Sequence, residues 1–226
     1  MTAAPVARRL GVVRAAGTRP LLVGGDLWVI DLGRALQSAG LTVLMWAGLE
    51  QQRQQISQAG LELAPGELLA AATGRGARLE GITAVFLLTG EDDFNALASA
   101  LLQGSVDGRV YRLAPPPHSH GVVAPYTGAE ILFHDRMTRS ELSRRYQQGE
   151  QIATQPGGSG LPAGHDILFL VRADRKLAAV TESSRPAPQT GDTIVSLGPP
   201  PAARPLGADA GAAAASDTAS PGVERR

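Results

Sequence analysis

A glycine turn near the N-terminus has the composition of a phosphate-binding loop. In LVGGDLWVIDLGRAL an apolar run leads into Gly24, Gly25 and Asp26, and a helix-length segment follows. Such a turn holds the pyrophosphate of a dinucleotide when glycines occupy all three positions of the pattern G-x-G-x-x-G. Counting back from Gly40, which we expect to end the helix, places these positions at Gly24, Asp26 and Val29.

Only one of the three positions is a glycine, and the substitutions oppose a dinucleotide. The carboxylate of Asp26 would repel a pyrophosphate, whereas the same side chain is a good N-cap for the helix. The end of the second strand, where an acid normally binds the ribose, reads Trp46 and Ala47. We therefore predict that Asp26 caps the helix, and Trp28 is the candidate to fill the vacated crevice.

A second polar cluster follows the apolar run ITAVFLL. It contains Thr89, Gly90, Asp92, Asp93 and Asn95. These residues could face a ligand at the carboxyl edge of a parallel sheet, which is where open α/β sheets bind. The favoured interpretation is that they begin a helix, because acids are stabilised at the positive end of the helix dipole.

No other group of residues predicts catalysis or metal binding. The chain has no cysteine, and His118 and His120 are two ligands where a metal site needs more. His134 and His165 stand alone, and no G-x-S-x-G elbow is present. We expect no catalytic residue and no metal.

Composition excludes two further classes of function. Lys and Arg number 21, and Asp and Glu also number 21, so no net charge favours nucleic acid. Arg144, Arg145 and Tyr146 are predicted to lie on a solvated or interface face of a short helix. No apolar run reaches about 18 residues, so we expect no membrane span and a soluble chain.

The elements that must position the glycine turn alternate between strand and helix. Apolar runs at 20–25, 41–46, 61–66, 82–90 and 109–115 predict strands, and 26–40, 49–60 and 91–104 predict helices. This alternation is typical of βαβ units and predicts a doubly wound, Rossmann-like parallel sheet. On the first helix, we expect one face to carry Leu27, Ile30, Leu32 and Leu36.

The regular alternation of predicted strands and helices ends at Pro115. TRSELSRRYQQG predicts a short helix capped by Thr138, and DILFLVRADRKLAAVTE and TGDTIVSLG predict a small β-rich C-terminal subdomain. The predicted division is a basic segment at 1–18, a Rossmann-like domain at 19–115, a loop, short helix and flexible linker at 116–165, a β subdomain at 166–198 and a disordered tail at 199–226.

Three stretches together resemble RCK domains, the TrkA-type regulators of potassium conductance. They are the glycine turn with its helix, LLTGEDDFNALASALL and ILFLVRADRKLAAVTESSRPAPQTGDTIVSLG. The resemblance implies a TrkA-N-like Rossmann domain with a TrkA-C-like subdomain, and a homodimer formed through the Rossmann-like domain. It also implies regulation by conformational coupling rather than catalysis.

The start of the chain, MTAAPVARRLGVV, is similar to the segment that follows the last membrane helix of bacterial monovalent cation:proton antiporters. Arg8, Arg9 and Arg14 fit the excess of positive charge on the cytoplasmic side. This resemblance implies a regulatory domain at the cytoplasmic face of the membrane, with the membrane domain of a Na⁺ or K⁺:proton antiporter as its partner.

Two alternatives remain open. One is an NAD(P)-dependent Rossmann oxidoreductase. The other is a nucleotide-sensing RCK domain in which backbone N–H groups of Gly24 and Gly25 hold AMP or ADP through a shifted turn. We expect no cofactor, because the nucleotide site is degenerate. If a nucleotide such as NAD, AMP or ADP binds, the candidate residues are Gly24, Gly25, Asp26, Thr89, Gly90 and Asp92.

Overall fold

A computed structural model describes residues 18–72, 79, 81–106, 108–114, 129–134 and 137–200. Most of the predicted basic segment, His118 and His120, and most of the predicted tail lie outside these residues. Within the described part, no helix has both the length and the apolar character needed to cross a membrane.

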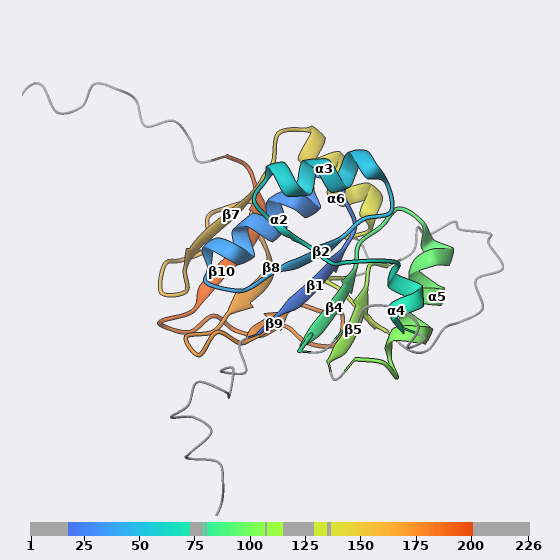
Figure 1. Cartoon of the computed structure of the whole chain (residues 1–226). Helices are drawn as coiled ribbons and strands as arrows, with labels where there is room; N and C mark the ends of the chain where they lie inside the picture. The colour runs from blue at the N-terminus through green and yellow to red at the C-terminus, as the bar shows by residue number, and fades with distance from the viewer. Residues whose placement is uncertain are drawn as a thin grey trace, which may run out of the picture.

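A parallel sheet forms the centre of the fold (Figure 1). Its strand order is β3-β2-β1-β4-β5-β6, the order of the Rossmann fold, so the predicted fold class is confirmed. The strands are β1 (Pro20–Val23), β2 (Leu44–Trp46), β3 (Glu62–Leu63), β4 (Ala84–Leu87), β5 (Arg109–Arg112) and β6 (Glu130–Ile131). The last strand extends the sheet beyond the predicted boundary at residue 115, because Tyr111 pairs with Glu130 and Arg112 with Ile131.

The two faces of the parallel sheet bury different residues, as expected for strands covered on both sides. Leu21, Val23 and Leu87 belong to a core under α4 (Leu68–Ala72) and α5 (Asp92–Leu102). Leu22 and Phe86 face the other core, together with α2 (Leu27–Ser38) and α3 (Glu50–Gln58). The apolar runs of the sequence thus alternate between two packed layers.

A four-stranded antiparallel sheet, in the order β7-β10-β8-β9, packs on the second face. Its strands are β7 (Gln151–Pro156), β8 (Asp166–Val171), β9 (Leu177–Ala179) and β10 (Thr193–Gly198). The rings of Phe86 and Phe169 meet edge to face at 5.1 Å, which joins the two sheets. The C-terminal β unit therefore packs against its own Rossmann-like domain, beside α2 (Figure 1).

Strand β7 corrects the predicted boundary at residue 166. The sequence QIATQP is largely polar, and its side chains are exposed or half-buried, so it lacks the apolar signal of a strand. Its whole length pairs with β10, from Gln151 opposite Gly198 to Pro156 opposite Thr193. The predicted flexible linker starts inside this strand. The strand forms through pairing with the buried neighbour β10 rather than through burial of its own side chains.

The predicted helix ends are confirmed where local chemistry decides them. Gly40 follows α2 with φ +89°, a conformation that favours glycine. Helix α6 (Arg139–Gln147) begins after Thr138, whose hydroxyl accepts from the N–H of Glu141 at 3.3 Å. The prediction for Leu27 is wrong: its side chain is exposed, because it begins α2 on the side away from the core.

Candidate functional site

A crevice of about 380 Å³ opens at the carboxyl ends of β1, β2 and β4. This is the point where the strand order reverses, and open α/β sheets bind their ligands at such a point. Five of the six candidate nucleotide-binding residues line it, and Asp92 does not. The lining residues are Gly24, Gly25, Asp26, Trp46, Ala47, Gly48, Leu49, Gln52, Thr89, Gly90, Glu91, Phe94 and Arg139.

The two glycines of the turn are each held against a neighbouring element. Gly24 has φ +150°, and its N–H donates to the carbonyl of Trp46 at 2.8 Å. A Cβ on Gly24 would lie 3.1 Å from the carbonyl oxygen of Leu88. A Cβ on Gly25 would lie 2.5 Å from Cβ of Gln52, so that side chain covers this part of the turn. A ligand that approached the backbone of Gly25 would have to move Gln52.

Asp26 does not cap α2 through its side chain, contrary to the prediction. Its Oδ2 accepts instead from Arg139, with Nε at 3.0 Å and Nη2 at 2.8 Å. A guanidinium offers a charge-assisted bond that competes well with a neutral backbone N–H. The negative charge that we expected to repel a phosphate is therefore compensated inside the crevice.

Sequence reasoning did not identify Arg139 as a site residue. Arg139 is 113 residues from Asp26 along the chain, and no local pattern connects the two. The capping pattern at Thr138 correctly marks it as the first residue of a helix, and that was the only available signal. The topology brings the beginning of α6 to the carboxyl edge of the parallel sheet.

The Thr89–Gly90 segment forms another wall of the crevice. Thr89 Oγ1 donates to Oδ1 of Asn95 at 2.7 Å, and Asn95 Nδ2 donates to the carbonyl of Thr89 at 3.0 Å. Asn95 is buried, so it holds the loop and does not face a ligand. Asp92 and Asp93 lie in the first turn of α5, which agrees with the favoured interpretation that this cluster begins a helix.

The pKa of Asp92 is raised above its ordinary value. Partial burial of the carboxyl is the main cause, and the nearby charge of Arg112 opposes it. The carboxyl therefore holds its proton to a higher pH than an exposed aspartate. It stands beside the crevice rather than in it.

An aromatic pair occupies the position where a dinucleotide site carries its ribose-binding acid. The rings of Trp46 and Phe94 stack at 5.6 Å with an interplanar angle of 8°. Nε1 of Trp46 donates to the carbonyl of Gly66 at 3.1 Å, which fixes the indole. Trp28, the candidate to fill the crevice, does not line it, because this residue lies in α2 with its side chain buried in the core.

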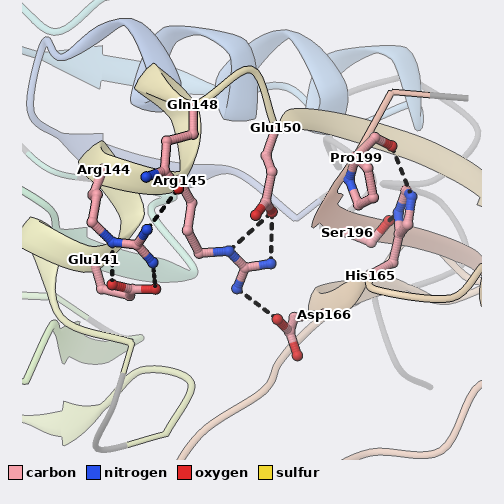
Figure 2. Close-up of polar contacts among 9 residues, drawn as sticks. All are labelled: Glu141, Arg144, Arg145, Gln148, Glu150, His165, Asp166, Ser196 and Pro199. Atoms are coloured by element: carbon pink, nitrogen blue, oxygen red, sulfur yellow. Dashed lines mark hydrogen bonds and ion pairs between the residues drawn. The ribbon is translucent and has the colours of Figure 1, made fainter.

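The other end of α6 is tied to the antiparallel sheet (Figure 2). Arg145 donates to Glu150 at 2.7 and 2.9 Å and to Asp166, at the start of β8, at 2.6 Å. Only 12% of the Arg145 side chain is exposed, so of the two predicted alternatives, a solvated or an interface face, the solvated one is wrong for this residue. Arg144, by contrast, is exposed and contacts Glu141 and Gln148 on the outer side of the helix.

Tyr146 ties α6 to α2. Its hydroxyl donates to Oδ2 of Asp31. Partial burial, the hydrogen bond to this carboxylate and its charge raise the pKa of Tyr146 to about 12. The first residue of α6 therefore lines the crevice. Its last turn contacts both α2 and the antiparallel sheet.

His165 is one of the two isolated histidines of the sequence, and both lie in the described part of the chain. Its ring nitrogens lie 3.2 Å from the hydroxyl of Ser196 and 3.1 Å from the carbonyl of Pro199, so it ties the residue before β8 to the end of β10 (Figure 2). Within the residues that the structure describes, no three acidic, histidine or cysteine side chains gather as metal ligands.

The matches among known proteins are to solved structures. No protein-family model and no curated protein matches the chain. Among solved structures, the chain is similar to the NAD(P)-binding domain of an exopolyphosphatase-related protein from Archaeoglobus fulgidus, with 18% identity and a TM-score of 0.44. The match covers 57% of this chain and 94% of that one. The strand order of the parallel sheet by itself shows the Rossmann-like fold.

Proposed function

We propose that this chain is a non-enzymatic regulatory domain of the RCK type, which binds a compact nucleotide such as AMP or ADP in the crevice. We further propose that it acts, as a homodimer at the cytoplasmic face of the membrane, on the membrane domain of a monovalent cation:proton antiporter. The observation that carries the ligand proposal is the guanidinium of Arg139 beside Asp26 in the crevice.

The size and charge of the crevice support a compact ligand. Its volume of about 380 Å³ is near the lower end of the roughly 300–1,000 Å³ that is common for ligand pockets. Trp46 and Phe94 line this volume, which is closer to the size of a mononucleotide than to that of a dinucleotide. Arg139 supplies a positive charge suited to a phosphate.

The chemistry of the lining supports binding rather than catalysis. Among the described lining residues, the ionisable groups are Asp26, Glu91 and Arg139, and two of these three are paired with each other. A hydride-transfer enzyme would also need a substrate-binding domain with an acid or base near the cofactor. The antiparallel sheet packs on a sheet face rather than over the crevice, which favours a regulatory role.

A thermal-shift measurement tests the ligand. A ligand at about 100 times its Kd stabilises the folded protein by about 2.7 kcal/mol, so binding raises the melting temperature measurably. We expect AMP and ADP to raise it and NAD to raise it less. A chain whose melting temperature responds to none of the three would contradict the nucleotide proposal, and a response to NAD alone would favour the oxidoreductase alternative.

The antiporter role needs a transport measurement. Everted membrane vesicles that contain an antiporter encoded with or beside this chain should dissipate a proton gradient when Na⁺ or K⁺ is added. We expect AMP to change that rate only when this chain is present, because a ligand shifts a conformational equilibrium only through differential affinity for its states. An unchanged rate, together with the absence of such an antiporter gene nearby, would remove this part of the proposal.

A further inference from the structure

We infer that Arg139 is a cation shared between two anions, Asp26 in the empty crevice and a terminal phosphate in the filled one, and that α6 carries this exchange to the antiparallel sheet. The ligand half of this inference rests on the proposed function. The helix half rests only on contacts within the chain.

The Asp26–Arg139 pair is suited to exchange. Nε and Nη2 of Arg139 both approach the same oxygen, Oδ2 of Asp26. The strongest arginine pairs instead use two nitrogens and two oxygens in parallel. The side chains of Arg139 and Asp26 keep 40% and 25% of their exposure, so water screens the pair. A phosphate dianion, with more charge and three oxygens, can compete for the same guanidinium.

The guanidinium of Arg139 packs against Gly90 at a defined position in the crevice. A Cβ on Gly90 would lie 2.6 Å from Cζ of Arg139, so the guanidinium lies flat against a residue with no side chain. Phe94, Trp46 and Gln52 line the same space. Movement of Arg139 toward a ligand within the crevice therefore breaks its contact with Asp26.

Helix α6 links this contact to the rest of the fold. Arg139 is its first residue, and nine residues of helix span about 13 Å. Near the other end, Arg145 holds Glu150 and Asp166, and Tyr146 holds Asp31. The loop after α6 leads directly into β7, which pairs along β10. A change at Arg139 can thus reach both α2 and the antiparallel sheet through one rigid element.

Hydrogen exchange of the full chain without ligand tests the helix. Arg139→Gln and Asp26→Asn each break the pair, so we expect both to speed amide exchange in α6 and in β7. Arg139→Lys keeps the charge and should change exchange less. Arg144→Gln removes the same charge from an exposed site on the same helix and should leave β7 unchanged. Unaltered exchange in β7 in both pair-breaking variants would overturn the coupling.

Calorimetric titration with AMP and adenosine tests the phosphate. We expect the wild-type chain to bind AMP at least about tenfold more tightly than adenosine, because a charged hydrogen bond has about this effect. Arg139→Gln should abolish the preference, and Asp26→Asn should strengthen AMP binding severalfold, since it removes the competing anion. Arg144→Gln serves as the control and should bind like the wild type.

The outcomes distinguish the ligand half of the inference from its helix half. AMP binding that is unaffected by Arg139→Gln, or weakened by Asp26→Asn, would overturn the exchange while the proposed nucleotide site survives. Failure of every protein to bind AMP would remove the proposed ligand and the phosphate half together. The hydrogen-exchange result then still decides whether α6 couples the crevice to the antiparallel sheet.

Discussion

Gly90 leaves the space that the guanidinium of Arg139 occupies. A Cβ at residue 90 would lie 2.6 Å from Cζ and 2.8 Å from Nη1 of Arg139. The obstructing atoms are the far end of a flexible side chain, so Gly90→Ala should displace Arg139 without distorting the backbone. Because exposed ion pairs contribute about 0–1 kcal/mol, we expect the free energy of unfolding to fall by no more than about 1 kcal/mol. Urea unfolding measures it.

Gly108→Ala is the matched comparison for that variant. A Cβ there would lie 2.2 Å from the carbonyl oxygen of Thr83, which is backbone and cannot move aside. We expect a loss of about 1–3 kcal/mol, as for overpacked sites. Equal losses in the two alanine variants would show that Arg139 is held more rigidly than we infer.

Phe94→Ala should weaken the aromatic wall of the crevice. Phe94 is half-buried and stacks on Trp46, and a ring pair contributes about 0.5–1.5 kcal/mol beyond buried area. We therefore expect the free energy of unfolding to drop by about 1–2 kcal/mol and the fluorescence of Trp46 to change. Leu97→Ala, one turn along α5 at a 47% exposed position, should stay within about 0.5 kcal/mol of wild type. A fluorescence spectrum unchanged by Phe94→Ala would contradict the stacked arrangement.

Tyr146→Phe should change the alkaline limit of stability. The pKa of Tyr146 rises from 10.0 to about 12 in the folded chain, through burial and its bond to Asp31. Between these pH values the folded protein keeps the phenol proton and the unfolded chain has released it, so stability falls as pH rises. Below pH 10 the variant should be less stable by about 1 kcal/mol, and the difference should shrink toward pH 12.

Urea midpoints measured from neutral pH to pH 12 check this prediction. Arg144→Gln, on the exposed side of the same helix, should run parallel to the wild type. A constant gap between Tyr146→Phe and wild type across the whole range would mean that the hydroxyl does not hold its proton through Asp31.

The crevice could be placed from the sequence because its position depends on local patterns. Apolar runs identified the strands, and a turn at the carboxyl end of β1 must meet the loop after β4 in this topology. Gly24 and Gly90 therefore come together as expected. β7 could not be found in this way, because its sequence is polar and it forms a strand through pairing with β10.

The sequence by itself determined the Rossmann-like fold class and the first five strands of the parallel sheet, since hydrophobic periodicity and glycine-ended helices are local properties that each segment carries. Only the tertiary structure decided what the crevice contains. Asp26 meets Arg139 across 113 residues, and Tyr146 meets Asp31 across 115. Such contacts form where topology brings long polar side chains together, and no short stretch of sequence encodes them. In the folded chain, the turn that lacks the full cofactor-binding pattern supplies Asp26, one partner of an ion pair. The other partner, Arg139, is the first residue of α6.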